Sequence, residues 1–320
     1  MPDQIKNIIA DQSSLTSSAL KQSSASAQNV DFVSKILFLI VLYKTDLNES
    51  PAFQSLKKTV RPFLSQGYVD VLICDNSPSL EIDDFGQIDN EEFNLYYLHD
   101  PANPGISLSY NRGAEIASLK GKEWMLVLDQ DTTMQTDSLQ KYVDALKNYP
   151  NFPVYAPMLY SNNLLLSPCK YIMNRGTHLA KIEPGVHFLK ARNVLNSGLL
   201  ISIDAYQNVG GYDENVWLYF SDFVFFDRLK VLYKKFVVVD CLIEHQLSSS
   251  DYTNAKFALN RFTYYCQGAK AASLSNGELK SYLGYTIMVG LRSILMSYRF
   301  KSISFFKVFI KAFSLGKNEN

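Results

Sequence analysis

The sequence has no excess of charge of either sign and no long hydrophobic run. Lysine plus arginine and aspartate plus glutamate each number 31, so no overall field attracts nucleic acid, and we expect no nucleic-acid partner. The longest early apolar run, residues 36–43, is far shorter than the roughly 20 residues that a helix needs to cross a bilayer. Residues 1–30 have acids near their start and no apolar centre, so we expect no signal peptide.

Cysteine is scarce and scattered. The four cysteines, Cys74, Cys169, Cys241 and Cys266, form no C-x-x-C pair and have no histidine beside them at metal-ligand spacing. This pattern excludes the common cysteine-based zinc sites. It is typical of reduced, mostly buried thiols in a cytosolic protein.

Residues 1–33 are rich in serine, glutamine and alanine. A segment of this composition buries too little apolar surface to offset the entropy lost on ordering, so we expect a mobile tail. We expect the main domain over residues 34–268 and basic amphipathic helices over residues 269–320.

From Lys35 onward, short β-type runs alternate with helix-length amphipathic stretches. We predict strands at residues 36–43, 68–74, 94–99 and 124–128, and helices at residues 52–64, 106–119 and 137–148. This alternation indicates an α/β fold with a mostly parallel, Rossmann-like sheet flanked by helices. Beyond Tyr149 we expect an antiparallel extension that binds the second substrate, with strands at 154–160, 171–182, 194–202 and 236–243 and a helix at 222–233.

Polar side chains follow each predicted strand. The clusters are Tyr43-Lys44-Thr45-Asp46, Asp75-Asn76-Ser77, His99-Asp100 and Asp129-Gln130-Asp131. Ligands bind at the carboxyl ends of strands in such sheets, so the four clusters predict one site.

Asp129 and Asp131 directly follow an apolar run. Residues two apart point the same way from an extended backbone, so both carboxylates can reach one hard divalent cation such as Mg²⁺ or Mn²⁺. That cation would neutralise the charge on a departing diphosphate. An isolated D-x-D motif is common and often has no function.

Asn103-Pro104-Gly105 and Asn111-Arg112-Gly113 bracket the start of a predicted helix. Gly105 allows close backbone approach, and a helix N-terminus presents free N–H groups to an anion such as a diphosphate. The alternative is an ordinary Asn-Pro turn with a helix cap.

Asp222 lies in the aromatic segment Trp217-Leu218-Tyr219-Phe220-Ser221-Asp222-Phe223, after the turn Gly210-Gly211-Tyr212-Asp213-Glu214. Apolar surroundings disfavour the charged carboxylate and raise its pKa toward the working range of a general base. The alternative is that Ser221 or Asp222 caps the helix. His245 follows the predicted strand 236–243; it is either structural or a third ligand near the metal.

Taken in order, these motifs resemble glycosyltransferase family 2, the inverting enzymes with a GT-A fold, and more closely its bacterial rhamnosyltransferase-like branch. The resemblance spans residues 36–265. Besides the motifs above it rests on Val41-Leu42-Tyr43, Leu72-Ile73-Cys74, Asn196-Ser197-Gly198, Arg228, and Arg261 with Tyr264-Tyr265.

The resemblance implies a role for each predicted site residue. Asp222 would be the catalytic base, and Asp131 with His245 would hold Mg²⁺ or Mn²⁺ on the donor diphosphate. Trp217, Asp213 and Glu214 would lie on the acceptor side. The donor-binding residues would be Tyr43, Asp75, Asn76, Asn103, Gly105, Asn111 and Asp129. The family often has acids two residues after the base and just before it, where this chain has Val224 and Tyr219-Phe220-Ser221. These differences concern the identity of the acceptor more than the activity, because Asp222 itself is kept.

Residues 280–317 contain no acidic residue and seven basic ones among many aromatic and aliphatic residues. Basic amphipathic helices of this kind lie in anionic membrane surfaces without spanning them. The alternative is a pair of helices that pack on the catalytic domain with their lysines in water.

We therefore predict a hexosyltransferase on the inner face of the cell membrane, acting in cell-surface polysaccharide synthesis. It would move a sugar, rhamnose as the first guess, from a dTDP- or UDP-sugar to a hydroxyl of a glycan or lipid-linked acceptor. The alternatives are a nucleotidyltransferase, which would carry a Gly-rich basic loop after the first strand, and an inactive nucleotide-sugar-binding module.

Overall fold

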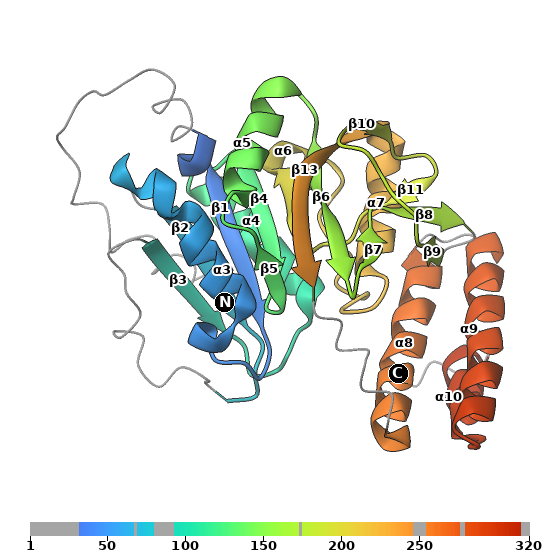
Figure 1. The fold of residues 1–320 in the computed structure, drawn as a ribbon. Helices are drawn as coiled ribbons and strands as arrows, with labels where there is room; N and C mark the ends of the chain where they lie inside the picture. Colours follow the sequence, from blue (N-terminus) through green and yellow to red (C-terminus); the bar gives the residue numbers. More distant parts are fainter. Residues whose placement is uncertain are drawn as a thin grey trace.

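The computed structural model describes residues 32–66, 69–79, 93–172, 175–245, 254–275 and 279–314 (Figure 1). Residues 1–31 of the expected tail lie outside the described residues. Val33, at the end of that expected tail, is buried in the core.

One large mixed sheet forms the centre of the molecule, with strands in the order β10-β13-β6-β12-β4-β1-β2-β3. Four of them are adjacent and parallel: β1 (Ile36–Leu42), β2 (Val69–Asp75), β3 (Phe93–His99) and β4 (Trp124–Asp129). Every residue of β1 and β2 is buried. These strands confirm the parallel α/β arrangement predicted for the first half, and their carboxyl ends meet at one edge.

Helices cover both faces of this sheet. The apolar cluster on one face includes residues of α3 (Pro51–Val60) and α5 (Ser138–Asn148), and the cluster on the other face includes residues of α4 (Ile106–Leu119), α6 (Ile203–Asn208) and α7 (Ser221–Leu232). Ser50 caps α3 by accepting from the Phe53 N–H at 3.4 Å, and Pro51 follows at the first helical position, a usual N-terminal pair. Short 3₁₀ turns, η1 (Leu47–Glu49) and η2 (Arg61–Gln66), flank α3.

The second half extends the sheet with strands of both directions. β12 (Leu199–Ser202) runs antiparallel to β4 and to β6 (Val154–Ser161), whereas β13 (Lys235–His245) runs parallel to β6. The remaining strands of this sheet are β5 (Thr132–Met134), β7 (Leu164–Ser167) and β10 (Gly185–Phe188).

Two predicted strands of this half are wrong. Residues 171–182 are divided between β8 (Cys169–Ile172) and β9 (Arg175–Thr177), and of residues 194–202 only β12 is a strand. β8, β9 and β11 (Arg192–Asn193) form a small separate sheet. Its strands are mostly exposed, so they lack the apolar run from which a strand is recognised.

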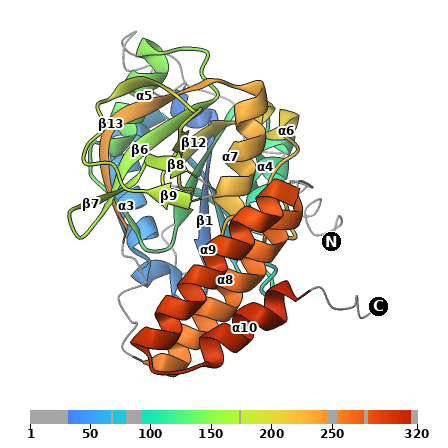
Figure 2. The same cartoon turned by 90° about the vertical axis from the view of Figure 1, so that its right-hand side faces the viewer.

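The carboxyl-terminal part is a layer of three helices, α8 (Ala255–Ser275), α9 (Leu279–Arg299) and α10 (Ser304–Phe313), beside the sheet (Figures 1 and 2). The helices share an apolar cluster with Val216, Phe220 and Val224. The boundary expected between residues 268 and 269 falls inside α8. Among the described residues, no helix is long and apolar enough to cross a membrane.

Candidate active site

A cavity of about 410 Å³ opens at the carboxyl ends of β1, β2 and β4. It is also lined by the start of α4, the loop before α7, the end of β13 and one face of α8. Its lining residues are Val41, Leu42, Tyr43, Asn76, Asn103, Gly105, Ile106, Asp129, Gln130, Asp131, Trp217, Leu218, Tyr219, His245, Arg261 and Tyr264. The predicted convergence of strand-end clusters thus holds for three of the four; the cluster His99-Asp100 lies outside the lining.

Asp129 is held from both sides. Its Oδ1 accepts from the Tyr110 hydroxyl at 3.0 Å, and its Oδ2 accepts from the Ser197 hydroxyl. Tyr110 comes from α4 and is fully buried. With one donor on each oxygen, the carboxylate has a fixed orientation at the cavity wall.

Asp131 and His245 meet through strand pairing. β13 pairs with β5 so that His245 lies opposite Thr132, which brings its ring to Asp131, with Nδ1 3.2 Å from Asp131 Oδ1. Burial raises the pKa of Asp131, partly offset by His245 and reinforced by Asp129. The buried Nδ1 has no aligned hydrogen-bond partner among the described residues.

This donor set fits a divalent cation. No group of three or more His, Cys, Asp or Glu side chains in the described part of the chain is arranged to hold a metal by itself. Mg²⁺, however, usually takes one or two protein carboxylates and completes its shell with water and substrate phosphates. Asp131, with His245 Nδ1 3.2 Å from its Oδ1, matches that smaller requirement.

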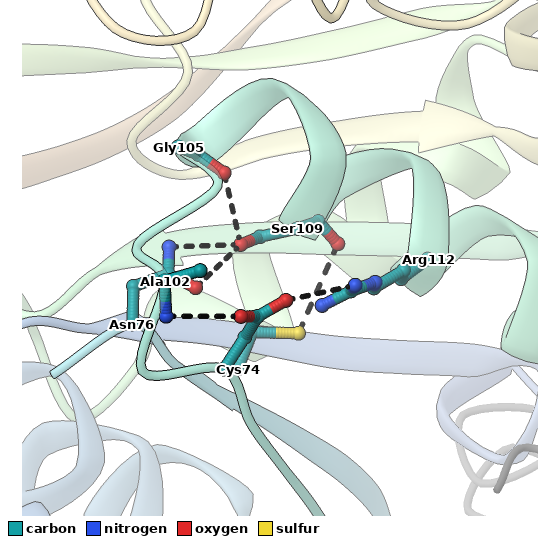
Figure 3. A network of polar contacts seen from close by, with 7 residues as sticks. Cys74, Asn76, Ala102, Gly105, Ser109 and Arg112 are labelled. Carbon is teal, nitrogen blue, oxygen red and sulfur yellow. Dashed lines mark hydrogen bonds and ion pairs between the residues drawn. The ribbon is translucent and has the colours of Figure 1, made fainter. Parts of the chain in front are cut away.

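Two of the predicted donor-binding residues on the β1–β2 side line the cavity. The Tyr43 ring is 43% exposed, while its backbone N–H donates to Gln130 Oε1 at 2.7 Å. Asn76 exchanges hydrogen bonds with the Ser109 hydroxyl of α4 (Figure 3). Asp75 is fully buried behind them, where it accepts from the Tyr97 hydroxyl at 2.5 Å and the Ser77 N–H at 2.9 Å.

The start of α4 differs from the prediction. The Ile106 N–H is not free, because it donates to the Trp217 carbonyl at 2.8 Å. Gly105 has φ +90°, and an added Cβ would lie 2.4 Å from the same carbonyl oxygen. Gly105 therefore allows the Trp217 backbone to approach, and Asn103 lines the cavity beside it.

Besides Asp75, four predicted site residues lie outside the cavity lining: Asn111, Asp213, Glu214 and Asp222. Asn111 donates to Glu214 Oε1 at 2.9 Å and to the Tyr212 carbonyl at 3.0 Å. Asp213 accepts from the Ser275 hydroxyl of α8 at 2.5 Å. These contacts hold the turn 210–214 against α4 and α8.

Asp222 is the second residue of α7, which directly follows the loop 217–220. Burial raises the pKa of Asp222 from 3.8 to about 7, and repulsion from Asp129 adds to the rise. This is the direction that the aromatic surroundings of Asp222 predict. The N-cap of α7 is Phe220 and not Ser221 or Asp222, but Asp222 Oδ1 accepts from the Phe223 N–H at 2.8 Å, so the carboxylate does bind a first-turn N–H, as the helix-cap alternative expects. Asp222 does not itself line the cavity.

Sequence reasoning gave no role to several residues of the site. Tyr110 and Ser197 orient Asp129, while Tyr219, Arg261 and Tyr264 line the cavity. Arg261 and Tyr264 matched the family pattern, but their position over the strand ends depends on how α8 packs.

The chain is similar to known glycosyltransferases in part of its sequence and to solved structures in its fold. Residues 47–193 match the model described as Glycosyl transferase family 2. The glucosyl-dolichyl phosphate glucuronosyltransferase of Haloferax volcanii is 27% identical over 173 residues, 51% of this chain and 52% of that protein. This chain thus spans about half the length of that curated relative.

Solved structures of S. aureus TarS share the fold. The fragment 1–349 has a TM-score of 0.51 and 13% identity over 89% of this chain and 93% of that one. The same fragment in complex with UDP-GlcNAc has a TM-score of 0.52 and 14% identity. Residues 47–193 of this chain are therefore similar to glycosyltransferase family 2, and the chain has a GT-A-like α/β fold with helices at its carboxyl end.

Proposed function

We propose that this protein is an inverting glycosyltransferase that takes a nucleoside-diphosphate sugar in the cavity at the carboxyl ends of β1, β2 and β4. The observation that carries the proposal is the convergence of Asp129, Asp131 and His245 there, with Asp222 in electrostatic range of Asp129. The match to the family over residues 47–193 supports the same reaction.

The proposal assigns each part of the donor to a part of the cavity. The exposed Tyr43 side chain would offer a stacking surface for the nucleobase, and Lys44, whose Nζ lies 5.2 Å from the centre of the Tyr43 ring, would attract the phosphates. Asp131 and His245 would hold Mg²⁺ or Mn²⁺. When bound, the metal would supply positive charge to the departing diphosphate.

Asp222 would remove the proton from the acceptor hydroxyl. The acceptor oxygen then forms a bond to the anomeric carbon, while the bond from that carbon to the diphosphate oxygen breaks on the opposite face. One base suffices for this displacement, unlike the paired carboxylates of sugar hydrolysis. Because Asp222 is the second residue of α7, the acceptor would approach from the α7 side of the cavity.

The relatives suggest which sugars to try first. TarS structures contain UDP and UDP-GlcNAc, and the Haloferax volcanii relative is named for glucuronosyl transfer to a glucosyl-dolichyl phosphate. We place UDP-sugars ahead of the dTDP-rhamnose suggested by the sequence. A glycan or lipid-linked sugar is the proposed acceptor, in surface polysaccharide synthesis.

We further propose that the protein binds peripherally to the inner face of the cell membrane. The described part of the carboxyl-terminal stretch, residues 279–314, has six basic side chains and no acidic one. Anionic lipids of the cytoplasmic leaflet attract such segments.

A screen of nucleotide sugars with Mn²⁺ tests the reaction. Release of a nucleoside diphosphate is measured for UDP-GlcNAc, UDP-glucose, UDP-glucuronic acid and dTDP-rhamnose, with and without a membrane lipid extract as acceptor source. Diphosphate release that depends on Mn²⁺ and increases with the extract supports the proposal. Formation of a nucleoside triphosphate and a sugar 1-phosphate when pyrophosphate is added would instead identify a nucleotidyltransferase, and binding without any turnover would identify a binding module.

A further inference from the structure

One face of α8 lies against the loop that precedes α7. Arg261, Tyr264, Tyr265 and Gly268 contact this loop. They are spaced at i, i+3, i+4 and i+7, so they form a single stripe along the helix. The loop, residues 217–220, is held along its whole length by this stripe.

Each residue of the stripe contacts a residue of the loop. The Tyr264 ring packs edge-on against Trp217 at 5.4 Å between centroids, and Arg261 Nε donates to the Tyr219 hydroxyl at 3.1 Å. Tyr265 packs on Phe220 at 4.9 Å. Gly268 permits the closest approach, because a Cβ there would lie 2.6 Å from the Tyr219 carbonyl oxygen.

The loop so held has two functions in the site. Trp217, Leu218 and Tyr219 line the cavity. Phe220 then takes a left-handed conformation with φ +72°, which is unfavourable for a bulky residue and persists only where the surroundings enforce it. Rings of α8 and α9, Tyr265 and Tyr285, enclose it. This enforced turn starts α7, and Asp222 is its second residue.

We propose that this stripe of α8 is a positioning device for the catalytic base and the acceptor-side wall, so that the carboxyl-terminal helices are part of the catalytic apparatus. The inference rests on the proposed glycosyl transfer. Its residues act through the loop and do not touch the reacting atoms.

Gly268→Ala tests the proposal, with Gly290→Ala as the matched control. Both glycines lie inside helices, so both substitutions gain similar helix propensity, about 1 kcal/mol. At Gly290 the new methyl group would meet only the end of the Phe309 ring, at 3.2 Å. At Gly268 it meets the Tyr219 backbone, which must move.

The expected result for Gly268→Ala is a fall in kcat of about 10- to 100-fold, because a shift of about 1 Å near a reacting group can cost 100-fold. UDP affinity with Mn²⁺ should change by less than about threefold, since Tyr43 and Asp131 are on separate elements. The acid limb of the kcat profile should also move to lower pH as Asp222 gains water. Gly290→Ala should leave all three unchanged.

Tyr265→Leu and Tyr265→Phe form a second pair. Tyr265→Leu removes the ring that encloses Phe220 and should reproduce the loss of kcat, whereas Tyr265→Phe keeps the ring and should restore most of the rate. The proposal is overturned if Gly268→Ala and Tyr265→Leu turn over at the wild-type rate, or if both lose kcat with an unmoved acid limb. If the wild-type protein itself releases no nucleoside diphosphate, the proposed function is wrong, and this outcome is distinct from a failure of the positioning proposal.

Discussion

At the scale of the residue, Asp129 and Asp131 are two positions apart yet differ in what they can bind. Both oxygens of Asp129 already accept hydroxyl donors, whereas Asp131 faces a histidine nitrogen that has no aligned donor or acceptor among the described residues. Asp131, which accepts from no hydroxyl group in the described part of the chain and has the His245 ring beside it, is therefore the better placed of the two carboxylates to bind a cation. Asp129 is better suited to accept a hydrogen bond from a sugar hydroxyl in a fixed direction.

Asp131→Ala should weaken Mn²⁺-dependent UDP binding by at least about tenfold, or 1.4 kcal/mol, because it removes the free carboxylate. Titration calorimetry with UDP, with and without Mn²⁺, measures this effect. Asp144→Ala, on the exposed face of α5, is the control and should bind normally. If UDP binding by Asp131→Ala still depends on Mn²⁺ as in the wild-type protein, Asp131 is not a metal ligand.

Asp222→Asn should lower kcat by about 10²- to 10⁴-fold, the usual contribution of a general base. UDP affinity should stay close to wild type, because the amide is isosteric and Asp222 lies outside the cavity lining. The two measurements are made on the same preparation. A variant that retains turnover would end the assignment of the base.

The pH dependence follows from the same carboxyl group. A general base works only when deprotonated, and burial with repulsion from Asp129 raises the pKa of Asp222 to about 7. Activity should therefore fall as pH decreases through about 7 and stay high above it. Tyr110, Tyr212 and Tyr285 also interact with this charge, but their pKa values are raised above 10 and they stay neutral across this range. A rate that is flat from pH 5 to pH 8 in single-turnover experiments would contradict the assignment.

At the scale of the element, the parallel half could be predicted, and so could β6, α7 and β13 of the second half, whereas the short strands β8, β9 and β11 could not. Strands β1 and β2 are apolar on both faces, and α4 begins and ends at the predicted residues 106 and 119, because local patterns determine these elements. The small sheet of β8, β9 and β11 has no such pattern. The role of the start of α4 was also missed, because the Trp217 carbonyl that occupies it comes from a distant part of the chain.

The approach of Trp217 to the start of α4 leads to a stability prediction. Gly105→Ala should lower the free energy of unfolding by about 1 to 3 kcal/mol or more, since it adds a clash to a strained backbone. Gly121→Ala is the matched control, because it has φ +64° but nothing within 4 Å of the new methyl group. It should show only the cost of the left-handed conformation, about 1 kcal/mol. Urea unfolding compares the free energies of unfolding of the two variants. Equal decreases would mean that the Trp217 backbone moves away from the new methyl group at no cost.

At the scale of the whole molecule, the carboxyl-terminal helices have one face on the catalytic domain and another in solvent. Their inner faces share a cluster with Phe220 and Val224, so this layer supports the site. The outer face of α9 is nonetheless apolar over about four turns, with exposed Leu283, Ile287, Leu291, Ile294, Leu295 and Tyr298. The inner faces of these helices therefore pack on the domain, as one expectation has it, while their outer face is exposed and amphipathic, as the other requires. A truncation before Lys280 would uncover the cluster, so membrane binding must be tested on the outer face alone.

Replacing Leu283, Ile287 and Leu291 together by glutamine should abolish binding to anionic vesicles and leave the fold intact. These side chains are 51%, 61% and 60% exposed, so their loss costs little burial in the folded protein, whereas burying each in the lipid interface would contribute about 1 to 2 kcal/mol. Flotation with phosphatidylglycerol vesicles measures binding, phosphatidylcholine vesicles give the charge control, and UDP affinity verifies the fold. Substituting Leu164 and Val231, exposed apolar residues outside these helices, should leave flotation unchanged. Wild-type protein that fails to float with anionic vesicles, or a triple variant that still does, would exclude the α9 face as the membrane contact.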